Sequence, residues 1–527
     1  MKKRNKTECQ QIINLYLKVQ KDIFMKIKKQ QETHEKQQEE QEKKQKHLQI
    51  HFYGIYLQFL DKKTNPYNSN STIFILCKNI KIYYKMKTTY KINKKQNKTK
   101  KIYNHKKICG KIISIKQGWK SIKIWGEPYE RGFAHGYLLH KEIEQINTVL
   151  PFIVKDQLKV SMEEFIRKTM ELIYPILVEK YPEFYEEMKG IHEGSLYKGV
   201  YVSLEMIIGW NSFLSMYSFY NDGNANRCSA FIATGEATEN GEIVMAHSTH
   251  SDFATGQLLN IIMTVEPSKG NIFRMQTSAG FICSTSDWFL CSNGIVGCET
   301  TITDINFKPV FGEPYFCRIR KVMQYANTLE ECVKYMKHEN AGDYSCSWLF
   351  GDTRTNEIML FELGLKEENI ERRMNGVFYG MNSAQGYNLR MKETTDKSHD
   401  DETTSVGSRN HRFNYLLNEK YYGKINTKIA KVIMSDHYDE ELKKQVLNKN
   451  GICKHSENDP NSKYKLYGSI DTKITTTKLA KKMSFFGMFG PSCGKTFSLK
   501  RFLREHPTYK KWELVVNDFK KQSWVLL

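Results

Sequence analysis

The chain has 527 residues, and its 80 Lys and Arg side chains against 58 Asp and Glu give a formal net charge of +22. Residues 1–116 hold 29 basic and 8 acidic side chains, whereas the remaining 411 residues hold 51 basic and 50 acidic. The excess positive charge therefore belongs to an N-terminal tail. This distribution excludes a body that binds nucleic acid through a general positive charge, because phosphate binding depends on such an excess.

The tail, residues 1–116, has the composition of a disordered extension. Residues 1–50 are rich in Lys, Gln and Glu and fit either a solvated helix or a disordered arm, and residues 80–107 contain no acidic side chain. Such segments bury too little apolar surface to fold by themselves. The apolar run at 52–60 is about half a membrane span, and the residues after Met1 are too polar for a secretory signal. We therefore expect no transmembrane helix and no signal peptide.

Residues 117–227 form a helical N-terminal segment by their pattern. Apolar residues recur at helical spacing between 128 and 220, and Ser161 and Glu164 have the spacing of a capping box before a new helix. A polar stretch at 221–227, rich in Asn and Gly, then interrupts the pattern. This stretch predicts a linker between the helical segment and residues 228–527.

The pattern of residues 228–527 predicts short strands followed by helices. Asn240-Gly241 between two apolar runs is a strong hairpin signal. Further strands are predicted at 258–265, 272–276, 288–290, 295–298, 348–351 and 358–363, and helices at 316–326, 329–336, 409–417 and 496–506. The expected fold class is α+β, with antiparallel sheets covered by helices.

Cys228 is the candidate nucleophile, because it follows the polar linker and opens a predicted strand. A thiol at this point can attack the Arg227 carbonyl, and hydrolysis of the resulting thioester would leave Cys228 as a new N-terminus. Its freed α-amino group, with a pKa of about 7.7–8.0, can then act as a base for the thiol. A buried core cysteine is the alternative interpretation of the same residue.

The segment His247–His250 is expected to lie near this thiol. If the hairpin loop spans 234–241, Cys228 pairs with His247; if the turn is only Asn240-Gly241, it pairs with Phe253. The two histidines lack a third ligand at suggestive spacing, and none of the 12 cysteines forms Cys-x-x-Cys, so neither a metal site nor a cofactor is expected. The segment Gly490–Thr496 lacks the first glycine of a phosphate-binding loop, since Phe489 stands there.

Several separated motifs resemble the phospholipase B-like (lamina ancestor) family, and one resembles the related autoproteolytic group that includes penicillin acyltransferases. The motifs of the first group are Arg227–Phe231, Glu242–Thr249, Gly297–Thr303, Trp348–Asp352, Phe361–Lys366, Ser435–Tyr438 and Ser492–Gly494, and the motif of the second is Tyr129–Gly136. The resemblance covers the chain from about Gly118 onward and none of the tail.

This resemblance implies an αββα four-layer sandwich of the N-terminal-nucleophile hydrolase type, activated by autoproteolysis between Arg227 and Cys228. Cys228 would be the nucleophile, His247 the histidine at a strand end, and Asn382 an oxyanion donor. Weaker assignments to the substrate and oxyanion site are Glu299, Thr300, His250 and Arg409. His250 stands where family members often carry Trp, and residues 340–347 depart from an Asn-rich family stretch, so substrate preference is open.

The resemblance also implies a function. We expect hydrolysis of acyl ester bonds in phospholipids or related lipids, with an amidase or acyltransferase acting on N-acyl small molecules as the alternative. Family members are lysosomal or extracellular, and the processed chains are expected to stay associated, with transient membrane-surface contact and no nucleic-acid partner. An inactive binding protein that uses the tail as a docking arm is a further alternative.

Overall fold

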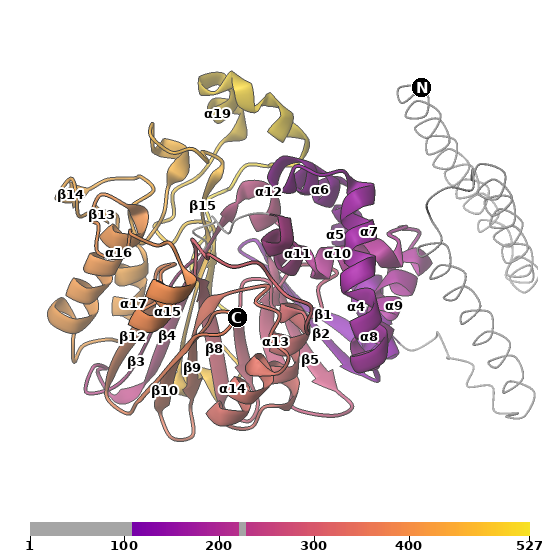
Figure 1. Cartoon of the computed structure of the whole chain (residues 1–527), viewed down its shortest axis with the longest axis horizontal. Helices are drawn as coiled ribbons and strands as arrows, with labels where there is room; N and C mark the ends of the chain where they lie inside the picture. The colour runs from indigo at the N-terminus through magenta and orange to yellow at the C-terminus, as the bar shows by residue number, and fades with distance from the viewer. Residues whose placement is uncertain (1–107, 221–227) are drawn as a thin grey trace, which may run out of the picture. The chain divides into compact units, whose positions relative to one another are not determined.

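The computed structural model describes residues 108–220 and 228–527 of the chain, and most of these form two β-sheets and the helices that cover them (Figure 1). The predicted tail up to residue 107 and the linker at 221–227, with Arg227, lie outside the described residues. Of the helices that are described, none is both long and apolar enough to cross a membrane.

The larger sheet has nine strands in the order β1-β2-β5-β6-β7-β8-β9-β10-β11. Neighbouring strands are antiparallel except for β2 and β5, which run parallel. The strands are β1 (Gly110–Lys116), β2 (Trp119–Gly126), β5 (Ile261–Pro267), β6 (Phe273–Thr277), β7 (Trp288–Cys291), β8 (Ile295–Thr301), β9 (Cys346–Asp352), β10 (Glu357–Leu363) and β11 (Glu368–Arg373). The parallel pair joins a strand from before the linker to one from after it.

The smaller sheet has six antiparallel strands in the order β12-β3-β4-β15-β16-β17. They are β3 (Cys228–Gly235), β4 (Gly241–Asp252), β12 (Gly376–Gly380), β15 (Tyr467–Thr476), β16 (Phe486–Phe489) and β17 (Val525–Leu526). A separate two-stranded ribbon pairs β13 (Tyr438–Asp439) with β14 (Lys444–Gln445).

The two sheets pack face to face through alternating apolar residues. Ala230 and Ile232 of β3 and Met245 of β4 join Trp288, Leu290 and Leu349 of the larger sheet in one buried cluster. Because successive side chains on a strand point to opposite faces, the intervening residues Phe231 and Val244 point outward and belong to a different cluster. The smaller sheet is therefore buried on both faces.

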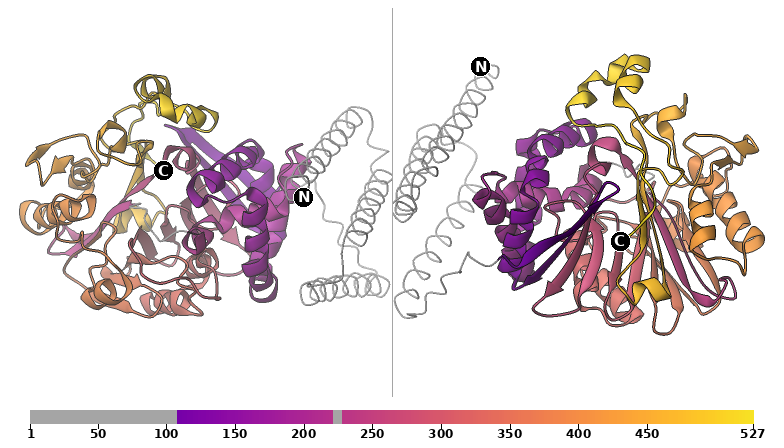
Figure 2. Two further views of the ribbon diagram at one scale, coloured as in Figure 1. Left: turned by 45° about the horizontal axis from the view of Figure 1, so that its top comes forward. Right: turned by 180° about the vertical axis from the view of Figure 1, so that it is seen from behind.

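Helices cover both outer faces, as Figures 1 and 2 show. One hydrophobic cluster joins the larger sheet to α4 (Pro128–Leu138), α5 (His140–Glu144), α6 (Ile146–Ile153), α7 (Met162–Leu172), α8 (Tyr174–Lys180), α9 (Pro182–Tyr197), α10 (Leu204–Asn211), α11 (Phe213–Tyr220), α13 (Tyr315–Tyr325) and α14 (Leu329–Lys337). Against the smaller sheet pack α16 (Ser405–Asn414) and α17 (Thr427–Met434). The expected α+β class is confirmed.

The remaining helices are short. They are α12 (Phe253–Gly256), α15 (Tyr387–Glu393), α18 (Thr477–Ala480) and α19 (Leu499–Glu505), with the π-helical or 3-10 segments η2 (Val154–Leu158), η3 (Tyr415–Lys420), η4 (Ser456–Asn458) and η5 (Pro507–Leu514). The capping signal at Ser161 is confirmed, because its side chain accepts a hydrogen bond from the Glu164 amide at the start of α7.

A buried ion cluster joins elements from the two sides of the linker. Glu187 of α9 accepts from Arg131 of α4 at 2.6 Å and from Arg320 of α13 at 2.9 Å, and all three side chains are at most 1% exposed. The helices α4 and α9 approach closely enough that a Cβ on Gly132 would lie 2.0 Å from the Glu187 carbonyl oxygen. Two elements that precede residue 221 are thereby tied to one that follows residue 227.

The predicted boundary at 116/117 is corrected by the structure. Residues 110–116, assigned to the tail by composition, form β1 and pair with β2 across the turn at Gln117-Gly118. β1 is an edge strand with mostly exposed side chains, so its mixture of Lys and Ile resembles the composition of the tail. The segment 117–227 is likewise not purely helical, because β2 forms part of the larger sheet.

Two shortened chains test this boundary. A chain beginning at Lys107 keeps β1 and should melt at the same temperature as the full chain. A chain beginning at Gln117 exposes the edge of β2 and should melt at least about 3 °C lower. Equal melting temperatures for the two shortened chains, measured by circular dichroism, would show that β1 contributes nothing to folding.

Candidate active site

Cys228 is the first residue of β3, and its side chain is 3% exposed. It pairs with Thr249 of β4, and Ala230 pairs with His247. Neither predicted register is therefore correct. The pairing is irregular between Ala233 and Gly235, and the observed register lies between the two that we predicted.

The Cys228 thiol lines a small cavity of about 40 Å³, enough space for a few water molecules. One part of the wall is apolar and the other carries carboxylates. The lining residues are Trp210, Phe213, Leu214, Cys228, Thr249, His250, Ser251, Asp252, Thr255, Leu259, Phe281, Thr285, Ser286, Asp287, Glu299 and Tyr344. Among these residues three are acidic and none is Lys or Arg.

Burial raises the pKa of the Cys228 thiol well above its ordinary value, and the nearby carboxylate of Glu299 raises it further. The Glu299 side chain is itself 1% exposed, and its Oε1 accepts a hydrogen bond of 3.0 Å from the Tyr344 hydroxyl. The backbone amide of His250 acts in the opposite direction and stabilises a thiolate. At neutral pH the thiol is protonated and needs a base before it can attack.

Arg409 lies beside the backbone of Cys228 and is completely buried. Its Nη1 donates to the Cys228 carbonyl oxygen at 2.8 Å and to the Ser229 hydroxyl at 3.1 Å. Its Nη2 donates to Asn382 Oδ1 at 2.9 Å, and its Nε donates to the Ser405 carbonyl at 2.8 Å. Burial lowers the pKa of this guanidinium to about 10, which still leaves it charged. A fixed positive charge therefore lies beside the backbone of Cys228.

Asn382 is buried immediately beyond β12 and has a left-handed backbone, with φ of 84°. Its Nδ2 donates to the Thr301 carbonyl at 3.0 Å, while its Oδ1 accepts from Arg409. Asn382 is not among the residues that line the cavity. Thr300 packs against Gly380, where a Cβ would approach its hydroxyl oxygen to 2.2 Å. Both residues hold the backbone around the site in place.

The two candidate histidines lie on opposite faces of β4. His247 is completely buried two residues before Thr249, and its ring is 6.5 Å from that of Trp288 between the sheets. His250 lines the cavity, and its Nε2 lies 3.2 Å from the Ile452 carbonyl oxygen. Burial lowers the pKa of both rings well below the ordinary value, and the positive charges of Lys473 and Lys454, respectively, lower it further. Both are therefore neutral at pH 7.

The sequence did not reveal a buried charged network that contacts Thr249, one of the residues that line the cavity. Asp471 of β15 accepts from the Thr249 hydroxyl at 3.1 Å and from Gln276 Nε2 at 2.6 Å, and Lys473 donates to Thr249 at 2.8 Å. It also missed Asp287, which lines the cavity with a positive φ of 54°. The one sign of this network in the sequence is the pair of charged residues, Asp471 and Lys473, within the strand-like segment that forms β15.

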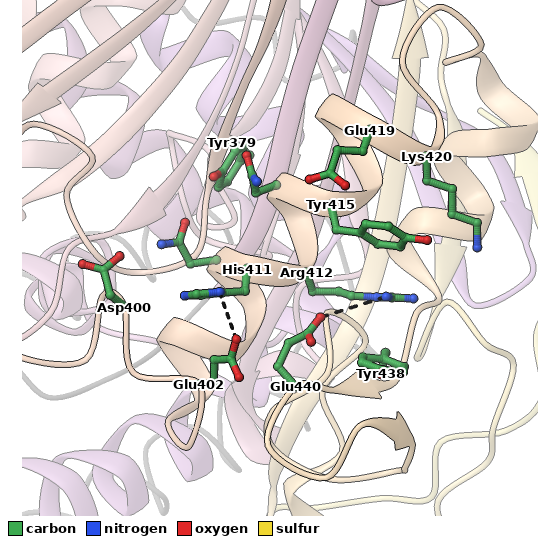
Figure 3. Close-up of a pocket in the computed structure, with 12 residues that line it drawn as sticks. Tyr379, Asp400, Glu402, His411, Arg412, Tyr415, Glu419, Lys420, Tyr438 and Glu440 are labelled. Carbon is green, nitrogen blue, oxygen red and sulfur yellow. Dashed lines mark ion pairs between the residues drawn. The ribbon is translucent and has the colours of Figure 1, made fainter.

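A second, larger hollow of about 720 Å³ lies on the outer helices α16 and η3 (Figure 3). Ion pairs cross it between His411 and Glu402 at 3.2 Å and between Arg412 and Glu440 at 4.0 Å. None of the predicted catalytic residues lines it. The smaller cavity, which contains the Cys228 thiol, is therefore the candidate active site.

Comparison with known proteins gives limited similarity. No family model matches the sequence. An uncharacterized protein of Archaeoglobus fulgidus is 26% identical over 266 residues, which are 47% of this chain and 44% of that protein, so the chain aligns with less than half the relative's length.

Two solved structures of conjugated bile acid hydrolase from Clostridium perfringens, each of a mutant form of that enzyme, also match. The first is 10% identical with a TM-score of 0.30 and covers 50% of this chain and 89% of its own. The second is 12% identical with a TM-score of 0.25 and covers 51% and 83%. Similarity at this level does not establish a common fold.

Replacing Glu299 should change the acidity of the Cys228 thiol. Glu299→Gln removes a negative charge beside the thiol and should lower its pKa, so alkylation by chloroacetamide should reach half its maximal rate at a lower pH. Mass spectrometry of the peptide containing Cys228 measures this rate. Tyr344→Phe is the control, because it keeps the carboxylate and should leave the profile nearly unchanged. An unshifted profile in Glu299→Gln would exclude Glu299 as a cause of the raised pKa.

Proposed function

We propose that this chain is the precursor of a cysteine N-terminal-nucleophile hydrolase that cleaves acyl–nitrogen bonds. The observation that carries the proposal is the position of Cys228: it begins β3 directly after the linker, its thiol lines the cavity, and Arg409 binds its carbonyl. Two stacked sheets with helices on both outer faces support the αββα sandwich that this class of hydrolase requires.

Activation would begin with attack of the Cys228 thiol on the Arg227 carbonyl carbon. The peptide C–N bond breaks as a thioester forms, and the nitrogen keeps the thiol proton as part of a free α-amino group. Water then hydrolyses the thioester, which leaves Arg227 with a carboxylate and restores the thiol. The new α-amino group has a pKa of about 7.7–8.0 and can deprotonate the thiol next to it, whose own pKa is raised.

Turnover would repeat this chemistry on a substrate. The thiolate attacks the acyl carbon, the α-ammonium group returns the proton to the leaving amine, and water hydrolyses the thioester. Asn382 is proposed as the oxyanion donor, because one Nδ2 hydrogen remains when the other is used on Thr301. His247 is proposed as a neutral polar group beside the nucleophile strand, and Thr300 supports the same backbone.

The charge of the cavity supports an amide substrate over a phospholipid. The cavity wall holds Asp252, Asp287 and Glu299 and, among the described residues that line it, no Lys or Arg. An anionic phosphate group would be repelled there, whereas an amine leaving group would be attracted. The aromatic side chains Trp210, Phe213 and Phe281 offer an apolar surface to the acyl group. Phospholipid ester hydrolysis remains the second candidate.

The size of the cavity supports activation by cleavage. About 40 Å³ is far too small for an acyl substrate, and small-molecule sites usually measure about 300–1,000 Å³. Phe213 and Leu214 of α11, the last helix before the linker, form part of the wall. Cleavage after Arg227 would release the end of this helix. The ion cluster around Glu187 and the parallel pairing of β2 with β5 would keep the two processed chains together.

Substitutions at Cys228 test the processing step. Wild-type protein should give a fragment whose N-terminal residue is Cys228, detected by intact-mass and peptide mass spectrometry. Cys228→Ser should be processed more slowly, because a hydroxyl is a weaker nucleophile, and Cys228→Ala should remain full-length and inactive. Cleavage at this bond in Cys228→Ala, or an unprocessed wild type without activity, would overturn the proposal and favour an inactive binding protein.

A substrate panel tests the bond that is cleaved. Processed protein should hydrolyse N-acyl amines with apolar acyl chains at a kcat/KM at least about tenfold above that for phosphatidylcholine vesicles, a difference of about 1.4 kcal/mol in transition-state stabilisation. Cys228→Ala serves as the blank for both substrates. A preference for the phospholipid would leave the nucleophile assignment intact and replace the amide by the ester as substrate.

A further inference from the structure

Two cysteines and two histidines meet outside the candidate active site. The side chains of His437, Cys453, His455 and Cys493 offer four ligand atoms that all lie within 4.8 Å of one another. Cys453 and His455 are buried, and His437 and Cys493 are half-buried. Two thiols and two imidazoles are the ligand set of many structural zinc sites. The mechanism proposed above uses none of these four side chains.

The distances fit one metal ion held between the four atoms. His455 Nε2 lies 3.5 Å from Cys453 Sγ and 3.4 Å from Cys493 Sγ. In a tetrahedral site with Zn–S of about 2.3 Å and Zn–N of about 2.0–2.1 Å, sulfur and nitrogen ligands lie about 3.5 Å apart. The rings of His437 and His455 are 5.2 Å apart and inclined by 50°, so both face the same small volume.

The surroundings of the two histidines also fit a metal site. His455 Nδ1 lies 2.8 Å from Glu457 Oε1, which holds the ring so that Nε2 faces the two thiols. A carboxylate behind a metal-binding histidine is a frequent arrangement, because it fixes the tautomer and strengthens the ligand. His437 Nε2 is buried and has no hydrogen-bond partner among the described residues outside the cluster. An ion in the cluster would satisfy that nitrogen.

Three segments distant in the sequence bring the ligands together. His437 precedes β13, Cys453 and His455 lie in the loop before η4, and Cys493 lies in the loop after β16. Gly490 and Gly494 flank Cys493 with φ of 106° and 76°, a backbone conformation that favours glycine. The Ser492 hydroxyl donates to the Met434 carbonyl at 2.5 Å and holds this loop against the end of α17.

We propose that His437, Cys453, His455 and Cys493 bind one structural Zn²⁺ ion. All four positions of a tetrahedral ion are taken by protein side chains, so the site has no open position for a substrate. Binding replaces the two thiol protons, which pass to solvent, and leaves both imidazoles neutral. The ion would join the β13 ribbon, the loop that carries Cys453 and His455, and the loop after β16.

This site would also support the candidate active site. Ile452, next to Cys453, offers its carbonyl oxygen to His250 Nε2 at 3.2 Å, and His250 lines the cavity. The Cys453 amide donates to the Asp436 carbonyl at 3.0 Å, so the loop that carries Cys453 is held beside His437. A metal ion here would fix the loop that orients His250. The proposal itself does not depend on the function proposed above, because its geometry involves no catalytic residue.

Metal analysis of the purified full-length protein tests the proposal. The wild type, prepared in reducing buffer without chelator, should contain about one zinc per chain by plasma mass spectrometry. Cys493→Ser should lose most of this zinc. Cys109→Ser is the matched control, because it removes a half-buried thiol outside the cluster and should retain the zinc. A wild type that contains no stoichiometric zinc, or stoichiometric iron or copper in its place, would overturn the proposal.

Cobalt provides a spectroscopic test on the wild type alone, so the proposal stays testable if Cys493→Ser fails to fold. Chelator-treated wild type titrated with Co²⁺ should show thiolate-to-cobalt charge transfer and the strong visible bands of tetrahedral cobalt, saturating at one equivalent and disappearing on addition of Zn²⁺. Peptide mass spectrometry of unreduced protein should find Cys453 and Cys493 as free thiols. A Cys453–Cys493 disulfide, or octahedral cobalt without charge transfer, would contradict a zinc site.

Discussion

The burial of the Arg409 guanidinium beneath the first residue of β3 is the constraint on which the geometry of the candidate site depends. A charge taken out of water is costly unless acceptors surround it, and here the acceptors are the carbonyls of Cys228 and Ser405 and the amide oxygen of Asn382. The start of β3, the segment that follows β12 and the first turn of α16 are therefore held in one arrangement.

A second buried charge, the Glu187 carboxylate, joins helices from before residue 221 to a helix from after residue 227. Burial disfavours ionisation of Glu187, yet the charges of Arg131 and Arg320 outweigh it and lower the pKa of this carboxyl. Removing the Glu187 carboxylate would leave the buried Arg320 guanidinium without an ionic partner among the described residues, which is strongly destabilising. Because Arg131 and Glu187 precede residue 221 and Arg320 follows residue 227, these ion pairs join helices from the two parts of the chain that the structure describes.

The proposed metal site and the candidate active site share one loop. Residues 452–455 supply a carbonyl to His250 on one side and two ligand atoms to the cluster on the other. The loop has little apolar burial of its own beyond Ile452 and Cys453, so cross-linking through an ion would replace a hydrophobic core in this part of the fold.

The sequence by itself determined the α+β class, most strands and helices, and the position of Cys228 at the start of a strand, because these follow from local hydrophobic period and turn residues. It did not determine that β1 belongs to the larger sheet, since this exposed edge strand has the same mixture of Lys and Ile as the tail. The register that pairs Cys228 with Thr249 also came only from the structure, because an irregularity in the hairpin shifts the pairing. The absence of Cys-x-x-Cys predicted no metal site, yet the tertiary structure brings together ligands from positions 437, 453, 455 and 493. Such ligand sets and buried charge networks are assembled from residues far apart in the sequence. They depend on how distant loops pack, which local sequence patterns do not predict.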